Sequence, residues 1–220
     1  MTDRRGAPFM EATNKCDGAE NDPRTLIHIG IVHTEADMGT LGESIQRATL
    51  QRLSFKAWRR KLRAIDKRWT EIEEIVERLL PPRGKVRLYQ DGLPVCGREL
   101  EIVEELANQG SRNHRLLLQL IEKGAVIMGT ESSDLLLEEY ERVKQALVLQ
   151  NVHRGGCSEI LQSGRGDCLL DRRNRFIAYR INTTLCTGET GILFLGMLHS
   201  LENLLDKDIN VIYPGAPPFA

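Results

Sequence analysis

Five short apolar runs alternate along this chain with longer segments that have the apolar spacing of helices. Most of these runs are rich in β-branched residues and are bounded by Gly, Pro or polar residues, which is typical of buried strands. Strands that alternate with helices predict an α/β fold, a mainly parallel sheet flanked by helices and joined by right-handed crossovers. The predicted strands are residues 25–32, 85–89, 125–129, 191–197 and 209–213.

A long helical segment follows the first predicted strand. After Gly42 no Gly or Pro occurs until Pro81, and apolar residues recur at helical spacing. We therefore expect residues 40–80 to form one very long helix, or two in tandem, as a helical insertion. A helix of about 40 residues would be ~60 Å long, so a break, or an arm that packs on a second copy in a homodimer, is expected. Shorter helices are predicted at 99–108, 113–123, 134–149, 171–185 and 200–205.

The domain prediction follows from these elements. Residues 24–220 are expected to form a single α/β domain, and the polar residues 1–23 a mobile leader without the apolar region of a signal peptide. The Gly- and Ser-rich stretch 151–168 is expected to be a loop, placed to act as a lid. No apolar run approaches the roughly 20 residues that span a bilayer. We therefore expect a cytoplasmic protein with no membrane partner.

The charge pattern makes nucleic acid an unlikely partner. The formal net charge is −1, and aromatic residues make up only 5% of the chain. Residues 51–68 carry eight Lys or Arg, with Phe55 and Trp58 among them, but a Glu-rich stretch follows at once. This balance favours a solvated helix face over a nucleic-acid surface.

Ionisable residues follow four of the five predicted strands. His33 and Glu35 follow the first strand, Asp91 the second, Glu131 the third and His199 the fourth. Because ligands bind at the carboxyl ends of the strands in such sheets, these side chains are candidates for one shared site. Imidazoles and carboxylates together can bind a divalent metal ion or divide general acid and base catalysis.

Two of these residues belong to a repeated tetrapeptide, Gly-x-x-His, at Gly30–His33 and Gly196–His199. A residue without a Cβ atom leaves room beneath each His for a ligand or for an opposing side chain. Close packing of a helix on the sheet would also explain the glycines, and the two explanations are compatible.

The helix predicted at 171–185 has three arginines among its first five residues, where the helix dipole disfavours positive charge. We infer that at least one of them binds an anionic group or fixes a carboxylate in the site. A solvated helix start is the alternative, with Arg172 and Arg175 as the expected solvent-exposed members. The chain contains no Walker loop, no GxGxxG and no GxSxG.

The segment from Arg173 to Ile181, which leads to Gly191 and on to His199, resembles the TraB/PrgY/GumN and TIKI group. It is also similar to the wider set that contains the erythromycin esterases and the ChaN haem-binding proteins. The resemblance implies an α/β fold of that kind and a site that uses two His, an Arg and a Glu. By position, the first three are His33, His199 and Arg173.

The Glu is the point where this chain departs from the family pattern. Members often have Val-x-x-Glu-Leu at the end of the second strand, whereas this chain has Gln90 and Asp91 there. Glu35 and Glu131 are the other candidates. Activities in the superfamily range from metal-dependent proteolysis to metal-free lactone hydrolysis and haem binding, so the resemblance does not fix a substrate.

The preferred hypothesis is a hydrolase of a small-molecule or peptide substrate. His33 or His199 would activate water, either directly or through a divalent metal ion held by these two residues and Glu35. A carboxylate from Glu35, Asp91 or Glu131 would bind the metal or orient a His. Arg173 would bind an anionic substrate group or stabilise the transition state.

Two other functions are left open by the sequence. One is a non-catalytic binding or sensing protein for haem, a metal or a small metabolite. The other is an interaction protein whose site has decayed, in which the two histidines would lie far apart.

Overall fold

The computed structural model describes residues 23–34, 36–37, 42–44, 47, 54–81, 84–152 and 164–214. Five parallel strands form one sheet with the order β3-β2-β4-β1-β5. The strands are β1 Arg24–Ile31, β2 Val86–Gln90, β3 Val126–Met128, β4 Thr190–Gly196 and β5 Ile209–Ile212. Each predicted strand corresponds to one of these, and the predicted α/β class is confirmed.

The register of the central strands determines which residues meet at the carboxyl edge of the sheet. The last residue of β1, Ile31, pairs with the last residue of β4, Gly196. On the other side of β4, Gln90 at the end of β2 pairs with Phe194. The loops that follow β1, β2 and β4 therefore leave the sheet side by side.

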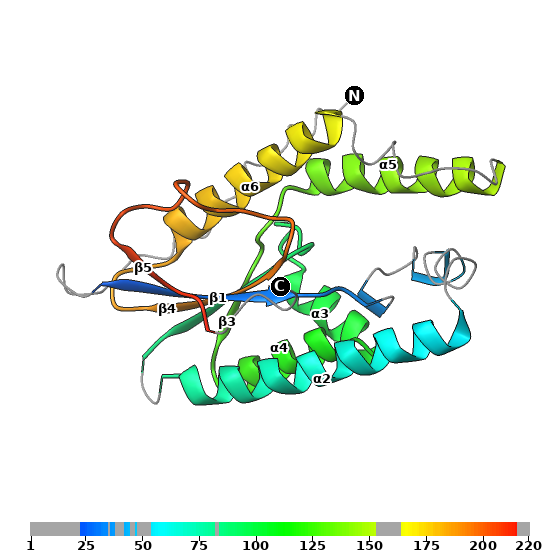
Figure 1. The fold of residues 1–220 in the computed structure, drawn as a ribbon. Helices are drawn as coiled ribbons and strands as arrows, with labels where there is room; N and C mark the ends of the chain where they lie inside the picture. Colours follow the sequence, from blue (N-terminus) through cyan, green and yellow to red (C-terminus); the bar gives the residue numbers. More distant parts are fainter. Residues whose placement is uncertain are drawn as a thin grey trace, which may run out of the picture.

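Helices lie on both sides of the sheet (Figure 1). The helices α2, α3 and α4 cover one face, α6 covers the other, and α5 extends past the carboxyl ends of the strands. Their bounds are α2 Phe55–Leu79, α3 Glu99–Asn108, α4 Arg112–Glu122, α5 Ser133–Val152 and α6 Gly164–Thr184.

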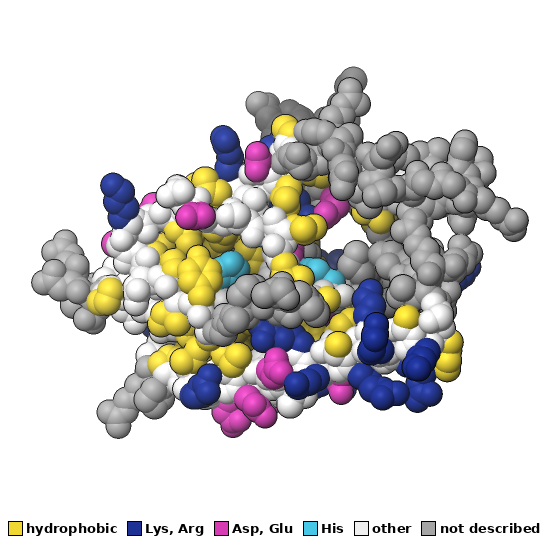
Figure 2. Space-filling model, in the orientation of Figure 1, with side chains coloured by type: hydrophobic (Ala, Val, Ile, Leu, Met, Phe, Trp, Pro, Cys, Tyr) yellow, Lys and Arg dark blue, Asp and Glu magenta, His cyan; other side chains and the backbone are white. Residues whose placement is uncertain are grey.

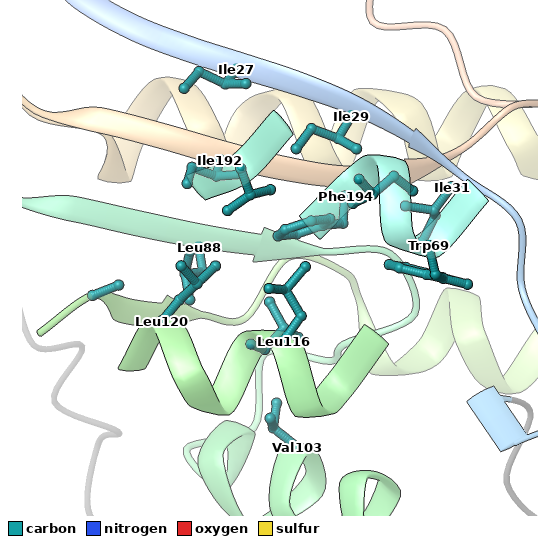
Figure 3. Close-up of a cluster of buried hydrophobic side chains, with 14 of the residues drawn as sticks. Ile27, Ile29, Ile31, Trp69, Leu88, Val103, Leu116, Leu120, Ile192 and Phe194 are labelled. Atoms are coloured by element: carbon teal, nitrogen blue, oxygen red, sulfur yellow. The ribbon is translucent and has the colours of Figure 1, made fainter. Parts of the chain in front are cut away.

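The larger core lies between the sheet and the three helices α2, α3 and α4. Alternate residues of β1 and β4, such as Ile29 and Ile192, point toward these helices. Trp69 of α2 and Leu116 of α4 pack against them, and Figure 3 shows these side chains meeting in one layer. The apolar spacing of both helices is what buries one face of each.

A second core lies on the opposite face of the sheet. Leu26, Tyr89 and Leu193 come from three neighbouring strands and pack against Ile177 and Ile181 of α6. Because Leu88 belongs to the first core and Tyr89 to the second, β2 follows the strict alternation of a strand. The same alternation points Gln90 toward the α4 side, a direction that matters for the site.

The helical insertion contains a helix boundary at Ser54. Its backbone is extended (φ −62°, ψ 151°), and its hydroxyl accepts a hydrogen bond from the Ala57 N–H, so it caps α2. The prediction of one unbroken helix over residues 40–80 is therefore wrong, and the tandem alternative agrees with helical residues at 42–44.

In Figure 2, Lys and Arg side chains gather over the part of α2 near its N-terminus. The homodimer through this segment stays a prediction.

Two further boundaries differ from the prediction. Residues 164–168, expected to be loop, lie in the first turns of α6, where buried Leu169 supplies packing that offsets the low helix propensity of glycine. Residues 200–205 form turns instead of a helix. There Asn203 adopts φ 63°, a left-handed conformation that a helix cannot contain. Residues 151–152 of the predicted loop lie in α5, and residues 153–163 fall outside the described residues, as does the leader except for its last residue.

In the part of the chain that the structure describes, no helix has both the length and the apolar character needed to cross a membrane.

Candidate active site

Asp91 is the centre of a buried polar cluster at the carboxyl edge of the sheet. It follows β2, and its carboxylate accepts hydrogen bonds from His33 Nε2 (3.0 Å), the Gly196 N–H (2.9 Å) and Arg173 Nη2 (3.0 Å). Burial raises the pKa of Asp91, but the hydrogen bond and charge of His33 and the charge of His199 outweigh it, so the pKa is lowered overall. Asp91 is therefore ionised near neutral pH.

Arg173, in α6, is held by three carboxylates. Its Nε and Nη2 atoms donate to the two oxygens of Glu131 (2.7 and 2.6 Å), its Nη1 donates to Glu139 (2.5 Å), and Nη2 also reaches Asp91. Arg172 and Arg175 are exposed, as predicted. Of the two roles expected for Arg173, this geometry provides the fixing of carboxylates, which uses four of its five N–H donors.

Glu131 follows β3 and is completely buried. Besides the two bonds from Arg173, its Oε1 atom accepts a hydrogen bond from the Gly92 N–H (2.9 Å). Burial raises the pKa of Glu131 to about 7, and the charge of Asp91 acts in the same direction, against the lowering by Arg173. The two carboxylates of this cluster therefore differ in how readily they take up a proton.

His33 lies two residues beyond the end of β1, with its Nε2 atom directed at Asp91. About a third of its side chain is exposed (32%), and its Nδ1 atom has no hydrogen-bond partner within the described part of the chain. Burial lowers the pKa of His33. The hydrogen bond and charge of Asp91, together with the charge of Asp37, raise this pKa by a larger amount. The net pKa is raised, so the imidazolium form is favoured.

His199 differs from His33 in its surroundings. Its side chain is 5% exposed, its Nδ1 atom contacts Asn174 Oδ1 (2.7 Å), and its Nε2 atom lies 3.6 Å from Asp91 Oδ1. Burial is the main cause that lowers the pKa of His199 to about 4, although Asp91 opposes it. Neutral His199 donates its Nδ1 proton to Asn174, which leaves a lone pair on Nε2.

The two glycines of the repeated tetrapeptide have different roles. A Cβ atom on Gly196 would lie 2.7 Å from Asp91 Oδ2, 3.4 Å from His33 Nε2 and 3.7 Å from His199 Cδ2. Both histidines therefore approach the same point. At Gly196 the absence of a Cβ atom leaves the space that these opposing side chains occupy, as expected. At Gly30 a Cβ atom would meet nothing within 4 Å among the described residues, so protein packing does not explain that glycine, and room for a ligand there stays a prediction.

A cavity of about 520 Å³ opens above this cluster. His33, Asp91, Arg173 and His199 line one part of it, and aliphatic side chains from α3, α5 and α6 line much of the rest. A cavity of this size with a few convergent polar groups is the usual form of a small-molecule site.

Asp91, Glu131 and His199 are grouped closely enough to hold a metal ion, with one ligand atom of each within 4.8 Å of the others. Arg173, however, already occupies both Glu131 oxygens and one Asp91 oxygen. A divalent cation would have to compete with this guanidinium, so the residues as arranged favour the metal-free state. The predicted ligand set of His33, His199 and Glu35 shares only His199 with this group.

Of the six site residues predicted from sequence, the structure brings five together; Glu35 falls outside the described residues. Asn174, which contacts His199, is not among the residues predicted from the sequence. Nor is His114, which lines the cavity with Asp37. The sequence signal that could have indicated Asn174 is its position directly after Arg173.

No protein-family model, curated protein or solved structure matches this chain. The resemblance to the TraB/PrgY/GumN and TIKI group remains a prediction based on the motifs alone.

Proposed function

We propose that this chain is a hydrolase in which His199 is the general base and His33 the general acid. The observation that carries the proposal is the contrast between the two histidines on either side of Asp91. Burial lowers the pKa of His199 to about 4, whereas Asp91 raises the pKa of His33. Two titratable groups with pKa values moved apart are the usual sign of separate acid and base roles.

The reaction is hydrolysis of an ester or amide of a small-molecule or peptide substrate. His199 Nε2 takes a proton from a water molecule as the water oxygen bonds to the carbonyl carbon. His33 Nδ1–H gives a proton to the leaving oxygen or nitrogen as its bond to that carbon breaks. Proton exchange with solvent then restores both imidazoles. Asp91 keeps His33 protonated through its hydrogen bond to Nε2.

Removal of metal ions is the first test of this scheme. Arg173 supplies the positive charge between Asp91 and Glu131, so we expect hydrolysis of p-nitrophenyl esters to survive exhaustive treatment with EDTA. Loss of activity on chelation, with recovery on adding Zn²⁺ or Mn²⁺, would instead support a metal ion on Asp91, Glu131 and His199.

The dependence on pH tests the assignment of acid and base. A base with a pKa of about 4 works above that pH, and an acid with a raised pKa works until the pH passes it. We therefore expect kcat/KM to rise through about pH 4 and to fall only above the ordinary histidine range. Replacing His33 with Gln should remove the alkaline limb and, because the charge of His33 lowers the pKa of His199, move the acid limb to higher pH.

Substitution of the two histidines should give the largest loss of activity. His199→Gln and His33→Gln should each lower kcat/KM by roughly 10²–10⁴-fold, the usual contribution of a general acid or base. His28→Gln is a matched control, because His28 lies in β1 but contacts the Tyr213 ring (centroids 5.1 Å apart) instead of the cluster. If His33→Ala and His199→Ala left turnover and ligand binding unchanged in folded protein, the proposal would fail.

The alternative is a binding or sensing protein that uses the same cavity without turnover. A Soret band on titration with haem, together with no hydrolysis of any ester or amide, would favour that function.

A further inference from the structure

The lining of the cavity differs between the sheet and the helices. The carboxyl edge of the sheet supplies polar groups, among them Gln90, Asp91 and His199. The helices α3, α5 and α6 supply aliphatic side chains. The catalytic groups proposed above do not use these aliphatic side chains, so this part of the lining needs an explanation of its own.

The helix α5 directs one face at the cavity. Leu136, Glu139, Tyr140 and Val143 line the cavity, and their spacing of three or four residues places them on one side of the helix. Leu137 is 62% exposed and is not part of the lining. Because α5 extends past the carboxyl ends of the strands (Figure 1), its inner face borders the cavity instead of packing on the sheet.

Four aliphatic side chains in the lining are half-buried and belong to neither core of the described chain. They are Leu106 of α3, Leu136 and Val143 of α5, and Leu170 of α6. We call these four residues the apolar wall. Apolar surface that faces water is unfavourable, and a continuous patch of it beside polar groups is a usual sign of a ligand site.

Two exposed apolar side chains lie where the cavity opens to solvent. Met197 and Leu198 are 50% and 84% exposed, and both also line the cavity. They are the middle residues of the Gly196–His199 tetrapeptide, so the turn that carries His199 also carries them. An apolar ligand that enters the cavity would cover these side chains as well.

The charge of the lining disfavours a ligand with an anionic chain end. Asp37, Asp91 and Glu139 line the cavity, and Arg173 is the one Lys or Arg among the described residues that do so. Arg173 is already shared among three carboxylates. A chain that ends in a carboxylate would therefore be repelled, whereas an uncharged chain would not.

The two histidines indicate which part of a substrate the apolar wall receives. This step rests on the proposed function, in which His33 gives a proton to the leaving group. The side chain of His33 is 32% exposed, against 5% for His199. The leaving group therefore lies toward solvent, and the acyl part of the substrate lies inside the cavity.

We propose that the apolar wall binds the acyl chain of the substrate, and that this chain is aliphatic and uncharged. The substrate class is then the esters or amides of fatty acids of intermediate length. A cavity of about 520 Å³ is of the size that encloses such a molecule.

Three p-nitrophenyl esters that differ only in the acyl chain test the proposal. They are the acetate, the octanoate and the mono-ester of suberic acid, whose chain has the length of the octanoate but ends in a carboxylate. After correction for uncatalysed hydrolysis, kcat/KM of the wild type should favour the octanoate over the acetate by at least about tenfold, because each buried methylene group contributes roughly fourfold. The octanoate should exceed the suberate by a similar factor, because the cavity repels the carboxylate.

Substitutions on two helices test the place of the chain. Val143→Trp and Leu106→Trp fill part of the cavity and should lower the ratio of octanoate to acetate turnover toward one. Leu137→Trp is the matched control on α5, because Leu137 is exposed and does not line the cavity, and it should keep the wild-type ratio. A cooperative thermal transition verifies each variant, and the comparison of esters in the wild type needs no variant.

A binding measurement separates this inference from the proposed hydrolysis. Calorimetry with octan-1-ol should show binding to the wild type and to Leu137→Trp, with affinity at least about tenfold weaker in Val143→Trp and Leu106→Trp. Such binding without turnover of any ester would support the apolar wall as a chain-binding site and contradict the hydrolase. Equal turnover of the acetate and the octanoate, or octanol binding that ignores both cavity substitutions, would overturn the inference.

Discussion

Both the amino end and the carboxyl end of the sheet contain a buried ion pair between an arginine and a glutamate, but the two pairs have different surroundings. At the amino end, Arg87 in β2 pairs with Glu189, which comes just before β4, and both side chains are less than 10% exposed. At the carboxyl end, Arg173 pairs with Glu131 and Asp91. Each end therefore contains a buried arginine whose guanidinium is paired with carboxylates from other segments of the chain.

The difference lies in what surrounds each pair. Glu189 accepts hydrogen bonds from Arg87 and from the Cys186 N–H (3.0 Å). Burial raises the pKa of Glu189, but these hydrogen bonds outweigh burial, and the pKa is lowered overall. No histidine in the described part of the chain contacts that pair. Asp91 at the other end contacts His33, lies near His199 and borders the cavity.

The comparison teaches that a buried ion pair by itself says little about function. The amino-end pair is fully occupied by protein partners and joins β2 to the loop before β4. The carboxyl-end cluster has groups that can still exchange protons with a ligand, and those groups are what suggest catalysis. The following predictions test this distinction.

The largest expected effect is on stability at the amino end. Arg87→Met leaves Glu189 buried without a cation and should lower the free energy of unfolding by about 3–5 kcal/mol in urea titrations. Adding Glu189→Gln should recover much of that loss. Turnover per folded molecule should stay at the wild-type value, because Arg87 lies at the opposite edge from the cavity.

Arg173→Met is the counterpart at the carboxyl end. It should destabilise the fold by a similar amount, about 3–5 kcal/mol, and also reduce kcat/KM, because Asp91 loses a hydrogen bond. Equal turnover in the Arg87 and Arg173 variants would remove the functional distinction between the two ends.

The two glycines offer a test of intermediate size. Gly196→Ala brings a Cβ atom to 2.7 Å from Asp91 Oδ2, so it should cost roughly 1–3 kcal/mol of stability and displace the carboxylate that both histidines approach. Gly30→Ala meets nothing within 4 Å and should leave stability and kcat/KM close to wild type. A larger loss at Gly30 than at Gly196 would contradict the geometry of the site.

Asn174 should give the smallest effect. Asn174→Asp keeps an acceptor for His199 Nδ1–H and adds a negative charge, which raises the pKa of His199 from about 4. Because the base is active only when deprotonated, the acid limb of kcat/KM should move to higher pH, with a loss of about tenfold or less at pH 5. An unchanged acid limb would show that His199 is not the group that titrates there.

The sequence predicted which residues lie at the carboxyl edge of the sheet, but it did not predict the contacts between their side chains. Alternating apolar runs and helical segments lead to a parallel sheet, and the carboxyl ends of parallel strands share one edge. This argument is sufficient to group His33, Asp91, Glu131 and His199, because it depends on local patterns and chain direction. The apolar runs themselves predicted the five strands within one residue of their observed ends.

Two errors in the predicted elements have identifiable physical causes. The glycines of residues 164–168 suggested a loop, but tertiary packing of Leu169 extends the helix through them. The break at Ser54 is an N-cap within a stretch that has no Gly or Pro, so the absence of helix breakers concealed it.

The sequence by itself determined the fold class and the strand ends at which a site could form. Only the tertiary structure decided that Arg173 is shared among three carboxylates and that the two histidines differ in pKa. It also joined Asp37 to Ser111, which is 74 positions away in the chain. The physical reason is that periodicity and chain direction are local properties, whereas burial and hydrogen-bond partners depend on segments that meet only in the folded chain.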